Sequence, residues 1–238
     1  MDMVATYAAS KAWNLRPNIV LVEGTSDEAI FKLANDLAIA AGGLLLGDEI
    51  CIVAAGQRDR GGTYGVAREL ITLRSMVPLV LDRDGRPAYR VIGLLDNDEA
   101  GRRIIRDVLR MDRSATEFHD IIALPPVPPV FSELNPVGRQ RECDLANLPY
   151  RGLDWEIEDA LSPRLLRIFD QKHPGMVTRR DKRSGKTHHE ITRAGKSKLH
   201  QLVHRETTLD DLVGVIQIVD MIRSLLGVRR PSTGSRAP

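Results

Sequence analysis

The spacing of apolar and polar residues near the start of the chain predicts a buried strand followed by a helix. Residues 18–22 read N-I-V-L-V, a continuous apolar run that is typical of a strand covered on both faces of a parallel sheet. Thr25 and Glu28 then stand three positions apart, the spacing of a capping box. Apolar residues recur every three or four positions from there to about residue 41, which predicts an amphipathic helix.

The same alternation of strand and helix continues to about residue 125. The predicted elements are a strand at 50–55, a helix that ends near 76, a hairpin of residues 77–81 and 89–95 around a turn at 82–87, a helix at 100–111 and a strand at 120–124. Strands that alternate with helices predict an α/β fold with a mostly parallel, Rossmann-like sheet flanked by helices.

Prolines mark the end of this predicted core. Five of the twelve residues from 125 to 136 are proline, a composition typical of a linker or an extended loop. We therefore expect a core over residues 1–128, a helical and basic extension over 129–228 that completes the site, and a flexible tail over 229–238. Within the extension, apolar spacing predicts helices at about 155–169 and 208–226.

Composition narrows the class of protein. Hydrophobic residues make up 42% and charged residues 28% of the 238 positions, as in an ordinary globular chain. Two cysteines, Cys51 and Cys143, are too few for a disulfide scaffold or a four-cysteine zinc site. The sequence contains neither an apolar run of membrane-spanning length nor a secretory leader pattern, so we expect a cytoplasmic protein.

Charge is concentrated in one stretch. Residues 172–205 contain ten Lys and Arg but only Asp181 and Glu190, a local charge of +8, while the whole chain carries +2 and the remainder therefore −6. This placement favours contact with a polyanion near a carboxylate-rich region. A solvated loop without specific partners is the alternative interpretation.

Two predicted strands end in carboxylates. Glu23 follows the first, and Asp96 and Asp98 follow the run at 89–95. Ligands of open α/β sheets bind beyond the carboxyl ends of strands, so neighbouring strands would bring these acids together. Converging carboxylates require neutralising cations, and all-oxygen ligands favour Mg²⁺ or Mn²⁺. Asp27, one helical turn beyond Glu23, is a further candidate ligand.

These motifs resemble the Toprim domain of topoisomerases, bacterial primases, recombination mediators and OLD (overcoming lysogenization defect) nucleases. The resemblance covers residues 18–125 and is carried by L-V-E-G-T-S-D at 21–27 and, about 70 residues later, L-L-D-N-D-E-A-G at 94–101. In the second motif, Gly101 lets the following helix begin close to the acids. Asp82 and Asp84 have the same Asp-x-Asp spacing. They precede Gly85 and a resumed strand pattern, so we assign them to a turn.

Among Toprim proteins, the chain is most similar to the OLD nucleases. Asp27 matches an acidic position four after the glutamate in that family, Glu158 in E-I-E-D at 156–159 matches a later acidic ligand, and Lys196 after Gly195 matches a late lysine. The resemblance implies a Toprim endonuclease that hydrolyses DNA with two metal ions. It implies metal binding by Glu23, Asp27, Asp96, Asp98 and Glu158, and catalysis by Glu23, Asp96, Asp98 and Lys196. Whether Glu23 is a metal ligand or a general acid and base stays open.

The resemblance also implies partners. OLD nucleases usually carry a fused ATPase, which this sequence lacks, so a separate ABC-type ATPase subunit is the implied partner in bacterial antiphage defence. Oligomerisation stays open. The basic stretch predicts contacts to the DNA backbone, with RNA as an open alternative, from Arg179, Arg180, Lys182, Arg183, Lys186, Arg193 and Lys198.

Other interpretations of the sequence are weaker or stay open. Gly185-Lys186-Thr187 and Gly195-Lys196-Ser197 lack the earlier glycine of a phosphate loop, which excludes that motif. The pair His200 and His204, with His188 or His189, has zinc-ligand spacing but no cysteine nearby, so polar surface is favoured. A non-catalytic Toprim binding module, or a primase- or topoisomerase-like subunit, stays open as an alternative function.

Overall fold

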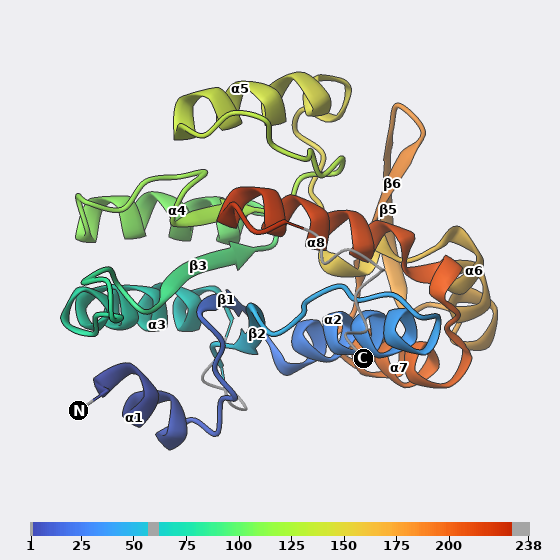
Figure 1. Ribbon diagram of the computed structural model, residues 1–238. Coiled ribbons are helices and arrows are strands. Elements are labelled where there is room, and N and C mark those ends of the chain that lie inside the picture. Colours follow the sequence, from blue (N-terminus) through green and yellow to red (C-terminus); the bar gives the residue numbers. More distant parts are fainter. Residues whose placement is uncertain (1, 57–61, 230–238) are drawn as a thin grey trace. The chain divides into compact units, whose positions relative to one another are not determined.

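The computed structural model describes residues 2–56 and 62–229 (Figure 1). The chain divides into two compact units, one formed by Met1–Glu28 with Leu46–Ala123 and the other by Ala29–Leu45 with Leu124–Pro238. Of the flexible tail expected at 229–238, residues 230–238 lie outside the described residues. The described residues include no helix whose length and apolar character would let it cross a membrane.

The first unit contains a four-stranded parallel sheet. Its strands are β1 (Asn18–Val22), β2 (Ile50–Ala54), β3 (Arg90–Leu95) and β4 (Ile121–Ala123), in the order β2-β1-β3-β4. All three pairings are parallel, and β1 runs beside β3 with Leu21 opposite Gly93. The predicted α/β class with a parallel sheet flanked by helices is therefore confirmed.

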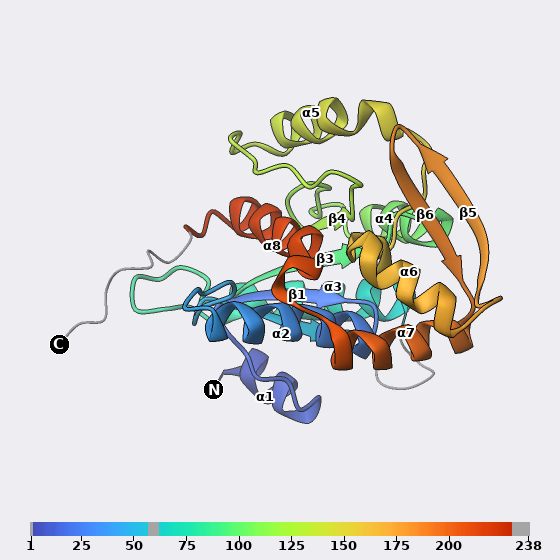
Figure 2. The ribbon, with the colours of Figure 1, turned by 90° about the vertical axis from the view of Figure 1, so that its right-hand side faces the viewer.

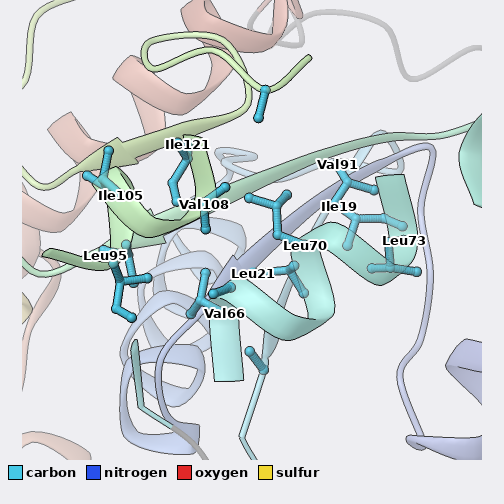
Figure 3. Packing of buried hydrophobic residues seen from close by; sticks show 14 of the residues in the cluster. Ile19, Leu21, Val66, Leu70, Leu73, Val91, Leu95, Ile105, Val108 and Ile121 are labelled. Atoms are coloured by element: carbon cyan, nitrogen blue, oxygen red, sulfur yellow. The ribbon is translucent and has the colours of Figure 1, made fainter. Parts of the chain in front are cut away.

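Helices α3 (Thr63–Met76) and α4 (Glu99–Met111) build the core of this unit. Val66, Leu70 and Leu73 of α3 are fully buried and pack with Ile19 and Leu21 of β1 (Figure 3). These apolar positions are three or four residues apart on the helix and alternate along the strand, so each element turns one continuous apolar surface to the other.

Helix α1 (Met3–Ser10) is attached to the same unit by a buried carboxylate. Glu69 of α3 is fully buried and accepts hydrogen bonds from Tyr7 Oη at 2.5 Å, from Lys11 Nζ at 2.9 Å and from Arg68 Nη2 at 2.8 Å. Burial opposes ionisation of Glu69, but the hydrogen bonds from Tyr7 and Lys11 outweigh it and hold its pKa below the ordinary value.

Two local predictions in this unit are wrong. Residues Val77–Leu79 form a 3₁₀ turn that continues α3 instead of a strand, because Pro78 lacks the donor a ladder needs; only one bridge, Leu81 to Pro87, remains of the hairpin. In α2 (Thr25–Ala40), Glu28 does not close a capping box but accepts a hydrogen bond from Ala54 N at 3.0 Å.

The turn assigned to Asp82 and Asp84 is confirmed. One carboxylate oxygen of Asp82 accepts hydrogen bonds from the backbone of Asp84 and of Arg86, both at 2.9 Å. Gly85 has a φ of 75°, which its lack of a side chain permits. Asp82 is therefore occupied in holding the turn.

The second unit is mainly helical and carries one antiparallel hairpin (Figure 2). Its elements are most of α2, then α5 (Pro136–Asn147), α6 (Pro163–Lys172), β5 (Val177–Arg183), β6 (Lys186–Ile191), α7 (Arg193–Glu206) and α8 (Val213–Leu226), with 3₁₀ turns at Leu148–Tyr150, Ile157–Ala160 and Leu209–Leu212. The residues of 124–135 form no helix or strand, and Gly227 ends α8 with a φ of 71°, both as expected.

The helix predicted at 155–169 begins later than expected. Ile157–Ala160 forms a 3₁₀ turn closed by Asp159, whose carboxylate accepts from Glu156 N at 3.1 Å. Helix α6 starts only at Pro163, because Ser162 caps it through Leu165 N and proline suits the first helical position. Apolar residues recur at helical spacing on both sides of this break, so the sequence pattern did not indicate it.

The basic stretch is folded, not a solvated loop. β5 and β6 pair antiparallel around Ser184 and Gly185, which have φ values of 47° and 89°. Positive φ at both central residues is the geometry of a two-residue hairpin turn. Helix α7, which was not predicted, follows with Thr192 as its cap.

Candidate active-site residues

The carboxyl ends of β1 and β3 bring two predicted site residues together. Glu23 follows β1 and Asp96 follows β3, and the two strands are parallel neighbours. The Glu23 Oε1 atom accepts a hydrogen bond from Asp96 N at 3.1 Å. The acidic ends of these strands therefore meet, as the sequence predicted.

Asp98 and Asp27 each accept a hydrogen bond from backbone that is close in sequence. Asp98 caps α4, with its Oδ1 atom 2.6 Å from Gly101 N. A Cβ atom at Gly101 would lie only 2.0 Å from the Asp96 carbonyl oxygen, so glycine is required for the helix to start this close. Asp27 accepts from Gly24 N at 3.0 Å. Asp27 also accepts from Ser26 Oγ at 3.2 Å.

A second acidic group occurs in the second unit. Lys196 Nζ lies 2.9 Å from Glu156 Oε2 and 3.3 Å from Glu158 Oε1. Glu158 is buried, and its Oε2 atom has no hydrogen-bond partner among the described residues. Burial is the main reason why the pKa of Glu156 is raised; Lys196 opposes the rise. The structure thus brings the predicted Glu158 and Lys196 together and adds Glu156, which sequence reasoning passed over although it belongs to the same E-I-E-D run.

Gly195 has a packing role in placing Lys196. A Cβ atom at Gly195 would lie 2.8 Å from Ile191 Cγ2 and 2.9 Å from Thr192 Oγ1. Its backbone N–H is bonded to the cap, Thr192 Oγ1, at 3.0 Å. The glycine before Lys196 therefore lets the first turn of α7 pack tightly, which agrees with the exclusion of a phosphate loop.

The donor atoms of both groups suit a hard cation, but no ligand set is preformed. All the predicted ligands are carboxylates, the preferred ligands of Mg²⁺ and Mn²⁺. Within residues 2–56 and 62–229, no three His, Cys, Asp or Glu side chains are grouped closely enough to hold a metal ion. The fit to a metal therefore depends on the donor types and on the unpartnered oxygen of Glu158. Glu23, Asp27, Asp96 and Asp98 belong to the first unit, and Glu158 and Lys196 to the second.

The histidines of the hairpin, His188 and His189, both contact Asp159. Asp159 Oδ2 lies 2.6 Å from His188 Nδ1, and Asp159 Oδ1 lies 3.0 Å from His189 Nδ1. Burial opposes ionisation of Asp159, yet these contacts hold its pKa below normal, while the bond to Asp159 raises the pKa of His188. The rings of His200 and His204 meet edge to face, with their centroids 4.6 Å apart. No third ligand joins any of them in the described chain.

The predicted nucleic-acid contacts line the hairpin and α7. Six of the seven are exposed, namely Arg179, Arg180, Lys182, Arg183, Arg193 and Lys198. Arg179 pairs with Asp181, and Arg180 lies 2.7 Å from Asp170. Lys186 differs, because it is half-buried and its Nζ atom lies 4.8 Å from the centre of the Trp155 ring.

Comparison of the chain with protein-family models, with curated proteins and with solved structures gave no match. The assignment of chemistry therefore depends on the motifs and on the geometry described above.

Proposed function

We propose that this protein is a divalent-metal-dependent Toprim nuclease of the OLD type that hydrolyses phosphodiester bonds of DNA. The observation that supports the proposal most is the meeting of Glu23 and Asp96 at neighbouring strand ends, with Asp98 at the start of the next helix. Open α/β sheets bind ligands beyond the carboxyl ends of their strands, which is where these acids lie.

Glu23, Asp96 and Asp98 would hold the first cation, with Asp27 beside them, and Glu158 would offer its unpartnered oxygen to another. Bound divalent ions supply Lewis-acid activation of water and of the phosphoryl group. Backbone N–H groups of this chain donate hydrogen bonds to the carboxylates of Glu23, Asp27 and Asp98 and so hold them in place.

Lys196 has two successive roles in this proposal. In the structure its ammonium neutralises Glu156 and Glu158, which are largely buried. The Lys196 side chain keeps 36% of its surface exposed, so an incoming phosphate can reach it. A fixed cation there would stabilise negative charge as it develops on the phosphoryl oxygens.

The exposed cations of the hairpin and α7 would bind the DNA backbone. Side-chain cations release counterions from DNA, so we expect binding that weakens steeply with salt and depends little on base sequence. By analogy with OLD nucleases, we also propose a separate ABC-type ATPase subunit as partner, with a role in bacterial antiphage defence.

The test is cleavage of supercoiled and linear DNA, and of RNA, by the purified chain with Mg²⁺ or Mn²⁺. Asp98→Asn should abolish cleavage, whereas Asp84→Asn should leave it unchanged. Asp84 is a matched control because it stands in the other Asp-x-Asp motif, is exposed and lies in the turn held by Asp82.

Cleavage that survives Asp96→Asn and Asp98→Asn, or that persists in EDTA, would refute the proposal. Salt-sensitive DNA binding without cleavage, with either metal and with the ATPase partner present, would select a non-catalytic binding module instead. Synthesis of a strand from nucleoside triphosphates would identify a primase-like subunit.

A further inference from the structure

A pocket of about 520 Å³ lies within the second unit, and all its lining residues belong to that unit. Small-molecule sites in proteins commonly occupy about 300–1,000 Å³. The pocket is bounded by the segment before α5, by the 3₁₀ turn at Ile157–Ala160, and by α6, β6 and the start of α8. Its size therefore suits a ligand larger than a single inorganic ion.

One wall of the pocket is apolar and open to a ligand. Pro128, Leu166 and Val213 line it, and Val213 leaves 50% of its surface exposed. Gln217 of α8 lies on the same lining with its side chain exposed, and an amide both donates and accepts hydrogen bonds. These residues offer apolar contact, and Gln217 can recognise the polar atoms of a ligand.

Three of the four acidic residues that line the pocket are already bonded to other side chains or backbone. Asp159 is bonded to His188 and His189, and Asp170 lies 2.7 Å from Arg180. Asp211 accepts from Arg164 Nε at 2.9 Å and from Thr208 N at 2.9 Å. Of the four acidic residues that line the pocket, only the exposed Asp210 has neither a side-chain hydrogen bond nor an ion pair in the described structure.

Lys186 supplies a cation without a counterion. Its ammonium is half-buried over Trp155, and no hydrogen bond or ion pair joins it to any described residue. Burial lowers the pKa of Lys186, and the charge of Asp159 opposes the effect. Trp155 and Tyr150 face this ammonium with their rings, at 4.8 and 6.0 Å from the ring centres, but neither ring carries a negative charge. A partly desolvated charge without a counterion is unfavourable, so an anion that enters the pocket would relieve this cost. Arg167, exposed on the lining, adds a second positive charge.

We propose that this pocket binds a nucleoside phosphate, with the phosphate at Lys186 and the base against the wall formed by Pro128, Leu166 and Val213. The ligand is either a free nucleotide or a nucleotide of a strand, which share this chemistry. None of the carboxylates assigned to the proposed nuclease lines the pocket, and nucleotide binding there requires no metal. The proposal assigns Lys186 to the pocket, whose lining also includes the exposed Arg180 of the hairpin.

The experiment measures binding of deoxyadenosine monophosphate in EDTA, by calorimetry on the wild-type chain and by Trp155 fluorescence in a Trp13→Phe background. The chain has two tryptophans, so this background leaves Trp155 as the sole reporter. We expect saturable binding, and at least tenfold weaker binding of adenosine and of inorganic phosphate tested separately.

Lys186→Met should weaken nucleotide binding at least tenfold, Lys186→Arg should restore part of it, and Lys32→Met should have no effect. Lys32 is an exposed lysine of the same unit that does not line the pocket. Circular dichroism of each variant checks that it is folded.

A short oligodeoxynucleotide serves as the second probe. The pocket is assigned to a nucleotide of a strand if the oligonucleotide displaces the mononucleotide. The same assignment follows if only the oligonucleotide binds and its binding depends on Lys186. Binding of the mononucleotide without such displacement assigns it to a free nucleotide. Absence of Lys186-dependent binding by either probe up to millimolar concentration overturns the proposal, as does equal affinity of the folded Lys186→Met variant.

Discussion

Replacement of Lys196 by methionine tests the charge balance of the second acidic group. Lys196 contacts Glu156 and Glu158, whose side chains are only 17% and 7% exposed. Leaving a buried charge without its partner typically costs about 3–5 kcal/mol. Because the Lys196 side chain is 36% exposed, solvent already weakens the pair, and we expect a loss of about 2–3 kcal/mol in the free energy of unfolding.

The loss should depend on pH. Without the cation, the pKa of Glu156 in the folded chain, which burial already raises, rises further above its unfolded value. A carboxylate with a raised folded pKa destabilises the protein where it is ionised, and protonation relieves this as pH falls. The deficit of Lys196→Met should therefore be larger at pH 8 than at pH 5.

Urea unfolding in EDTA, followed by circular dichroism at both pH values, measures this difference. Lys198→Met is the matched control, because Lys198 is an exposed lysine of the same helix and its replacement should change stability by less than about 0.5 kcal/mol. Equal deficits at pH 5 and pH 8, or a deficit no larger than that of the control, would show that Lys196 does not compensate the two acids.

Three further predictions concern the first unit and the hairpin. Glu69→Gln should lower the free energy of unfolding by about 2–3 kcal/mol in urea titrations; since the folded pKa of Glu69 is lowered, its contribution in the wild type is present above the ordinary value of 4.5 and is lost as pH falls. Gly101→Ala places a Cβ atom 2.0 Å from a carbonyl oxygen and should cost about 3 kcal/mol or prevent folding, whereas Gly85→Ala, with open space around it, should cost about 1 kcal/mol in the same titration. Arg179→Gln should weaken DNA binding equally for unrelated sequences and reduce the slope of log affinity against log salt by about 1, measured by fluorescence anisotropy.

The sequence predicted those parts of the fold whose signals are local. Apolar runs and helical spacing identified β1, β2, β3 and α4, because a strand or helix buried in a core must be apolar at positions that its own geometry sets. The turn at Asp82 was also predicted correctly, because its hydrogen bonds join residues only two and four positions apart. The strand predicted at 77–81 was wrong because Pro78 lies within that apolar run.

The β5–β6 hairpin shows the limit of such signals. Its residues are polar on both faces, so no alternation of apolar and polar positions indicated strands. Ser184 and Gly185 are residues typical of a two-residue hairpin turn. Because Gly185 is followed by Lys186 and Thr187, this segment was instead compared with a phosphate loop.

For the candidate site, the sequence by itself determined that Glu23 and Asp96 end buried strands and that Asp98 begins a helix. Only the tertiary structure decided which charges meet. The strand order placed β1 beside β3, and the second unit brought Lys196 to Glu156 across 40 positions of sequence. Local sequence sets backbone conformation and caps over a few residues, whereas the partner of a charged side chain depends on how distant elements pack, and no local pattern encodes that packing.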